Sequence, residues 1–95
     1  MKQKALIIAV LTAVLAGPAL AADCFADYKA KKENPLRLHY GVVQLSGECS
    51  KKSARKEVAK RISRDGWILM KVNSVFTSAD LSGKESDAGK FYLRY

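Results

Sequence analysis

Few residues of this chain have side chains suited to catalysis or metal binding. The sequence contains one histidine, His39, and two cysteines, Cys24 and Cys49. A Ser-His-Asp or Cys-His arrangement would have to use His39, and no phosphate-loop, zinc-protease or GxSxG pattern occurs. The acidic residues have no spacing that singles out a catalytic carboxylate pair. We therefore expect a protein without enzymatic activity, metal or cofactor, in which His39 lies on the polar face of a strand beside Arg37.

The two cysteines are better suited to a disulfide than to redox or metal chemistry. Redox pairs and zinc sites usually have close C-x-x-C spacing, which Cys24 and Cys49 lack. Closing a loop of this length stabilises a small domain by about 3–3.5 kcal/mol in the chain-entropy model. We predict a structural disulfide between Cys24 and Cys49, which would hold the start of the mature chain beside the start of the main helix.

The N-terminal residues have the pattern of a secretory signal. Two lysines precede the apolar run 5–16, and residues 19–21 supply the small side chains of a cleavage site. The apolar run is shorter than the roughly 20 residues that a membrane-spanning helix needs. We expect residues 1–21 to be removed as a signal peptide and residues 22–95 to form one small domain without a transmembrane span. The protein would be periplasmic or secreted.

Positive charge is the clearest functional signal in the rest of the chain. Without the two signal lysines, fifteen of the seventeen basic residues remain against nine acidic ones, a net charge of +6. Basic side chains gather at the start of the amphipathic segment 53–65, where they oppose the dipole of the predicted helix. Farther along the segment, basic residues recur every four positions and repel one another. The candidate anion-binding residues are Lys52, Arg55, Lys56, Lys60 and Arg64.

Several interpretations of this basic surface stay open. An anionic ligand or surface would relieve the repulsion, and lipid headgroups, lipopolysaccharide phosphates or an acidic protein all fit. The same charges also suit a solvated face without a specific partner. Nucleic acid is the weakest choice, because the aromatic residues do not interleave with the basic segment as a stacking platform requires. The alternative function is that of a small inhibitor or accessory protein that binds another exported protein through a sheet edge and the loop 77–90.

The hydrophobic periodicity predicts the elements that position these residues. Apolar residues recur every four positions in 53–65, and Gly66 is the expected left-handed stop of this helix. Alternation predicts strands over 36–45, 67–76 and 90–95. The segment 23–34 fits a short helix or an irregular strand, and we expect the helix. Strand 36–45 places Leu36, Leu38, Tyr40 and Val42 on one face and Arg37, His39, Gly41 and Val43 on the other.

The order of these elements predicts the fold. A strand, a helix and a strand in succession imply a parallel pair with a right-handed crossover, and the last strand would join it antiparallel. We expect a small α/β (α+β) sandwich, a βαββ sheet of about three strands with the main amphipathic helix on one face and a disulfide staple. The run from Ser53 through Trp67-Ile68-Leu69, with its Asp65-Gly66-Trp67 junction, resembles small uncharacterised βαββ domains that have a helix followed by a Gly-Trp-hydrophobic strand. That resemblance implies the fold and no site, because those families carry no established activity.

Overall fold

The computed structural model describes residues 23–95, so the predicted signal peptide lies outside the described residues. The sheet consists of β1 (Cys24–Lys32), β2 (Arg37–Leu45) and β3 (Ile68–Thr77), and the main helix is α2 (Lys51–Ser63). The C-terminal segment contains η1 (Ser78–Asp80), α3 (Lys84–Ala88) and η2 (Gly89–Phe91). A three-stranded antiparallel sheet, one main helix and a Cys24–Cys49 disulfide confirm the predicted small α+β fold. No helix between residues 23 and 95 is long and apolar enough to cross a membrane.

The order of the strands differs from the prediction. The elements follow one another as ββαβ, and both β2 and β3 pair antiparallel with the central strand β1. The predicted βαββ order with a parallel pair is therefore wrong, and so is the predicted helix over 23–34. Alternate β1 residues, among them Ala26, Tyr28 and Ala30, are completely buried. Their burial between two partner strands outweighs the local helix propensity of the lysine-rich stretch.

Tyr28 and Gly41 face each other across the β1–β2 pair. The ring of Tyr28 lies over Gly41 so closely that a Cβ atom at Gly41 would be 2.5 Å from the Tyr28 hydroxyl oxygen. A glycine inside a strand often marks such a close approach. Because Gly41 has no side chain, the tyrosine ring can lie over the neighbouring strand β2.

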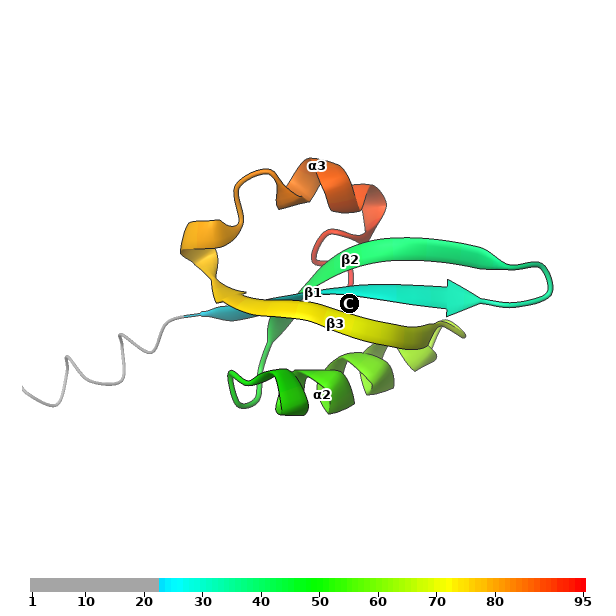
Figure 1. The fold of residues 1–95 in the computed structure, drawn as a ribbon, viewed down its shortest axis with the longest axis horizontal. Helices are drawn as coiled ribbons and strands as arrows, with labels where there is room; N and C mark the ends of the chain where they lie inside the picture. The colour runs from blue at the N-terminus through cyan, green and yellow to red at the C-terminus, as the bar shows by residue number, and fades with distance from the viewer. Residues whose placement is uncertain (1–22) are drawn as a thin grey trace, which may run out of the picture.

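The helix α2 packs against the sheet through a narrow apolar stripe. Ala54, Val58 and Ile62 are fully buried and join Tyr28, Val43 and other sheet residues in the main core. Ser50 caps the helix by accepting a hydrogen bond from the Ser53 N–H at 3.2 Å. At the other end Gly66 has φ +84°, the predicted left-handed stop. Figure 1 shows α2 on one side of the sheet and α3 on the other.

The C-terminal segment is not the loop and final strand that the sequence predicted. Residues 77–90 contain η1 and α3, and a second core forms where Ala88 meets Phe25, Val42 and Phe76. The last residues pair with β2 only through the bridge Val42–Tyr92 and the bond from the Leu93 N–H to the Val42 carbonyl, 2.8 Å. Because α3 is only five residues long, it is too short to show a helical period in the sequence.

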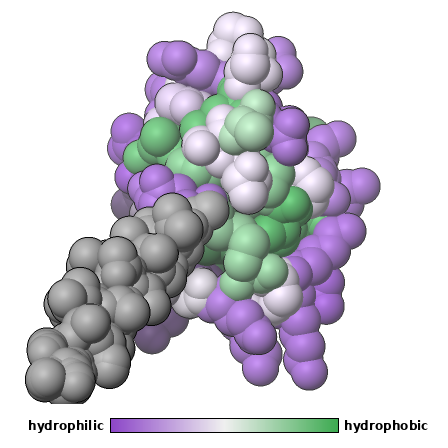
Figure 2. All heavy atoms as spheres, turned by 90° about the vertical axis from the view of Figure 1, so that its left-hand side faces the viewer, coloured by the Kyte–Doolittle hydropathy of each residue, from purple (hydrophilic) through white to green (hydrophobic). Residues whose placement is uncertain are grey.

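The two ends of the sheet differ in how they expose apolar residues. Figure 2 views the end where the chain enters β1 and shows hydrophobic residues gathered in the middle, with hydrophilic residues around them. The large side chains that are most exposed belong to the other end, around the 33–36 turn and the start of β3. We call the first the disulfide end and the second the hairpin end.

Candidate functional site

A pocket of about 290 Å³ lies at the hairpin end, where β1 and β2 meet the C-terminal tail and the turn after α2. Four basic, three aromatic and one acidic residue line it. They are Lys32, Arg37, Lys90 and Arg94, then Trp67, Phe91 and Tyr95, and Asp65. We call this the basic pocket. None of these residues belongs to the predicted anion-binding set.

The β1–β2 hairpin supplies two of the four cations. Lys32 and Arg37 are direct partners across the antiparallel pair, and like charges in this position destabilise a sheet. The ring of Trp67 offsets part of this repulsion, since Lys32 Nζ lies 4.7 Å and Arg37 Cζ 5.9 Å from the ring centroid. Trp67 follows the helix stop at Gly66, so the end of α2 sets its position.

The C-terminal tail supplies the other two cations. Lys90 Nζ lies 5.5 Å from the centroid of Phe91, and Arg94 Cζ lies 5.7 Å from that of Tyr95. The Tyr95 hydroxyl donates a hydrogen bond of 2.7 Å to Asp65 Oδ2. Burial and this hydrogen bond raise the pKa of Tyr95. The acidic side chain of the pocket is therefore already bonded, while four cations surround the hollow.

His39 forms part of the aromatic wall behind the pocket. Its ring stacks on Phe91, with centroids 3.6 Å apart and planes 7° apart, and meets Trp67 edge-on at 4.3 Å. Its Nε2 lies 2.9 Å from the Tyr28 hydroxyl oxygen. Burial, and then the charges of Lys32 and Lys90, lower the His39 pKa from 6.5 to about 4, so the ring is neutral near pH 7.

The predicted polar environment of His39 is thus wrong. The histidine is 9% exposed, and the strand face that it shares with Arg37 is the one that packs on α2. Leu38, on the face that the sequence marks as apolar, is 62% exposed. The aromatic residues that enclose His39 come from distant parts of the chain, so local alternation cannot reveal the inversion.

The predicted anion-binding residues remain spread along the outer side of α2. Lys52 and Lys56 line a hollow of about 240 Å³ together with Ser50, Ser53 and Glu48. The carboxylate of Glu48 opposes an incoming anion there. The other predicted residues are exposed and line no hollow with them; these are Arg55, Lys60 and Arg64.

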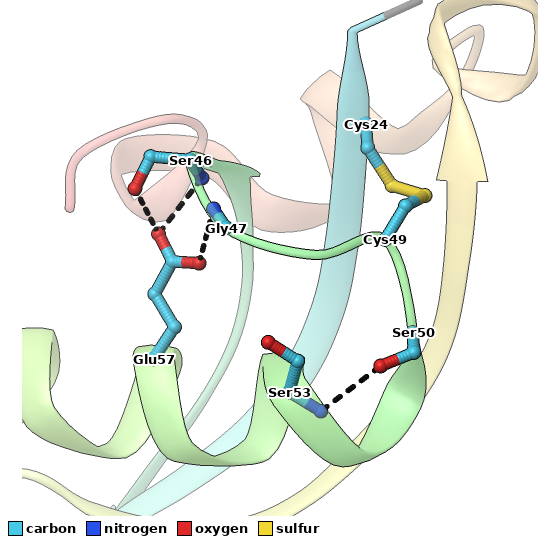
Figure 3. The surroundings of a disulfide bond; sticks show 7 residues. All are labelled: Cys24, Ser46, Gly47, Cys49, Ser50, Ser53 and Glu57. Atoms are coloured by element: carbon cyan, nitrogen blue, oxygen red, sulfur yellow. Dashed lines mark hydrogen bonds between the residues drawn. A yellow bond between two sulfur atoms is a disulfide. The ribbon is translucent and has the colours of Figure 1, made fainter.

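The loop before α2 is already bonded to a carboxylate of the protein itself, that of Glu57 in α2. Glu57 accepts hydrogen bonds from the Ser46 N–H at 2.9 Å, the Ser46 hydroxyl at 2.7 Å and the Gly47 N–H at 3.1 Å (Figure 3). Burial raises the pKa of Glu57, but these hydrogen bonds and Arg61 outweigh it and leave the pKa below its ordinary value. Glu57 thus occupies the hydrogen-bond donors of the loop, and Ser50 occupies the Ser53 N–H in the first turn of α2. Fewer free donors remain here for an external anion than in the basic pocket.

The sequence does contain a signal for the basic pocket. Residues 90–95, KFYLRY, combine two basic and three aromatic side chains in six positions, although their apolar alternation alone predicts a strand. Among residues 23–95, no three His, Cys, Asp or Glu side chains are close enough to hold a metal ion together. The chain matches no protein-family model, and searches among curated proteins and solved structures find no match to it.

Proposed function

We propose that this protein binds a small anionic ligand in the basic pocket and acts by binding, without catalysing a reaction. The observation that carries the proposal is the charge of the pocket, where four cations surround a hollow whose acidic residue, Asp65, is bonded to Tyr95. An anion between Lys32 and Arg37 would replace their repulsion with attraction to both. A volume of about 290 Å³ suits a ligand of a few charged groups, such as a polyphosphate or polycarboxylate.

The aromatic residues restrict the positions of the four cations before a ligand binds. Each of the four cations lies near an aromatic ring, which limits the side-chain freedom that binding would otherwise remove. The two arginines can each donate two parallel hydrogen bonds to a phosphate or carboxylate group. The pocket therefore favours ligands with planar or tetrahedral oxyanions over simple halide ions.

We also propose that the protein works in an oxidising compartment, either periplasmic or extracellular. The Cys24–Cys49 disulfide fits such a compartment, as does the signal-like pattern of the N-terminal residues. The basic face of α2, with Lys56 and Lys60, would add long-range attraction for anions.

The alternative, an inhibitor or accessory protein that binds another protein through a sheet edge and the 77–90 segment, takes second place. Asp27 pairs with Ser74 and Tyr28 with Val72, so Asn73 is an extra residue in β3. A second extra residue, Met70, follows from the next register shift. Such bulges in an edge strand discourage the addition of another strand.

The single tryptophan of the sequence allows a direct test, because Trp67 lies in the pocket. Titration of the mature protein with inorganic pyrophosphate or citrate should give a saturable change in Trp67 fluorescence. The double variant Lys32→Gln/Arg37→Gln should weaken binding by roughly tenfold or more, since each lost charge contact is worth about 1 kcal/mol. Higher salt should weaken binding to the wild type as well.

Two further variants make the result specific. Lys51→Gln removes an exposed charge that lines neither hollow, and it should leave the titration unchanged. Lys56→Gln/Arg64→Gln tests the predicted face of α2. A wild-type protein that gives no saturable signal, or a titration that only the α2 variant abolishes, would overturn the assignment to the basic pocket.

A further inference from the structure

Part of one sheet face is left uncovered by the C-terminal segment. In Figure 1 the β1–β2 hairpin extends beyond α3, and α2 lies on the other side of the sheet. Large apolar side chains on or next to this uncovered part are about half exposed or more: Leu36 64%, Leu38 62%, Met70 53% and Ile68 49%. We call these residues, together with Lys29, Lys31 and Lys71, the open face.

A bulge in β3 increases the apolar content of the open face. Lys29 pairs with Lys71 and Ala30 with Leu69, so Met70 is the extra residue between them. Met70 lines a hollow of about 420 Å³ together with Lys29, Leu38 and Tyr40. Bulges often turn a side chain toward a functional surface, and this one adds an exposed thioether to a face that already exposes Leu38.

The same face carries positive charge that the protein does not neutralise. Lys29 and Lys71 are direct partners in the β1–β3 pair, an arrangement that destabilises a sheet. Within residues 23–95 neither lysine forms an ion pair, whereas Lys31 pairs with Glu33 at 2.9 Å. An occupant of the open face must therefore be both apolar and anionic.

We propose that the open face docks on an anionic lipid surface. The exposed aliphatic side chains would enter the boundary between headgroups and acyl chains, while the lysines would stay at the level of the phosphates. A protein partner fits less well, because lysine is depleted in protein interfaces and hot spots are built mainly from Trp, Tyr and Arg. A second copy would bring Lys29 and Lys71 against the same charges.

This docking does not depend on the basic pocket. Residues alternate between the two sides of β1, so Lys29 and Lys32 lie on opposite faces of the sheet. A ligand in the pocket and a membrane on the open face can therefore be tested separately. Loss of the pyrophosphate signal without loss of lipid binding would affect only the first proposal.

The test is co-sedimentation of the mature protein with vesicles of phosphatidylglycerol and phosphatidylcholine in equal parts, and with vesicles of phosphatidylcholine alone. We expect binding to the anionic vesicles only. Lys29→Gln and Lys71→Gln should each weaken it about fivefold and together about thirtyfold, because a lysine near an anionic surface contributes about 1 kcal/mol. Lys51→Gln, the matched control, should leave partitioning within about twofold of wild type.

A second pair of variants tests the apolar contribution. Leu38→Asn should weaken binding to the anionic vesicles tenfold or more, while Leu93→Asn removes an exposed leucine outside the open face and should not. Thermal melts of both variants establish that they are folded.

Three outcomes would overturn the proposal. One is a wild-type protein that does not bind the anionic vesicles, and another is equal loss in the test and control variants. The third is a dimer, measured by sedimentation velocity, that Leu38→Asn dissociates, because the open face would then bind a second copy of the chain.

Discussion

The two ends of the sheet differ in whether their charged side chains have partners of opposite charge. At the disulfide end the buried Asp27 accepts hydrogen bonds of 2.7 Å from both Tyr40 and Ser74, and Lys84 Nζ lies 3.6 Å from its carboxylate. At the hairpin end, cations face cations in two cross-strand pairs, Lys32 with Arg37 and Lys29 with Lys71. The same three strands thus carry a compensated charge at one end and uncompensated charges at the other.

The stabilising polar contacts and the candidate binding surfaces therefore lie at different ends of the sheet. Asp27 links all three strands and α3 through hydrogen bonds and an ion pair. These contacts stabilise its end of the sheet against unfolding. The hairpin end keeps repulsive pairs and exposed apolar side chains, which lower the stability of the free protein and on which both binding proposals rest. Functional sites commonly carry such locally unfavourable arrangements.

The largest expected effect concerns the disulfide end. Replacement of both cysteines, Cys24→Ser/Cys49→Ser, should lower the free energy of unfolding by about 3–3.5 kcal/mol, because the open chain regains the entropy that the crosslink removes. Urea denaturation followed by circular dichroism measures this loss. The reduced wild-type protein should behave like the double variant. A loss below about 1 kcal/mol would show that the noncovalent contacts around Asp27 hold this end without the crosslink.

The pH dependence of stability separates the two ends. The His39 pKa falls from 6.5 to about 4 on folding, so between these values the unfolded chain binds the proton and the folded protein does not. Stability should therefore decrease by about 3 kcal/mol as the pH falls through this window. Thermal melts across this pH range should show the decrease in the wild type and a flatter profile in His39→Gln.

Asp27 affects the pH dependence of stability at lower pH than His39 does. Burial alone would raise the pKa of Asp27. The hydrogen bonds from Ser74 and Tyr40 and the charge of Lys84 outweigh burial, so the pKa lies below its ordinary value of 3.8. Its contribution is complete above the ordinary pKa and is lost as the pH falls through the folded value. Asp27→Asn should flatten the profile only below about pH 4. An identical flattening by both variants would contradict the division into two ends.

The smallest expected effect is a gain in stability. Lys32→Gln/Arg37→Gln removes the repulsion between direct cross-strand partners and should raise the free energy of unfolding by a few tenths of a kcal/mol. The His39 pKa should also rise, because Lys32 is one of the charges that lower it. Histidine NMR titration measures the second effect. A His39 pKa that does not move would place Lys32 farther from the ring in solution.

Local patterns predicted the elements that depend on local physics. The apolar stripe of α2, its stop at Gly66, two of the strands and the disulfide all follow from spacing within a short window or from the only two cysteines. Strand β1 could not be predicted in this way, because its burial depends on pairing with β2 and β3 on both sides. The exposure of Leu38 and the burial of His39 depend on a tail that begins fifty residues later.

The candidate site was harder to predict than the fold. The basic segment of α2 is continuous in sequence and therefore easy to recognise, whereas the basic pocket combines the 33–36 hairpin, the turn at Gly66 and the C-terminal tail. The ββαβ topology brings these three segments together. The KFYLRY pattern marks one of its walls but gives no information about the other two.

The contact between Gly41 and Tyr28 makes two positions of the sequence depend on each other. A methyl group at position 41 would collide with the tyrosine ring, and the tyrosine hydroxyl in turn faces His39 Nε2. We expect related chains to vary at these positions together, with a residue larger than glycine at 41 only where 28 is smaller than tyrosine. In an alignment of such chains, positions 28, 39 and 41 should change as one unit, and the aromatic wall of the pocket should change with them.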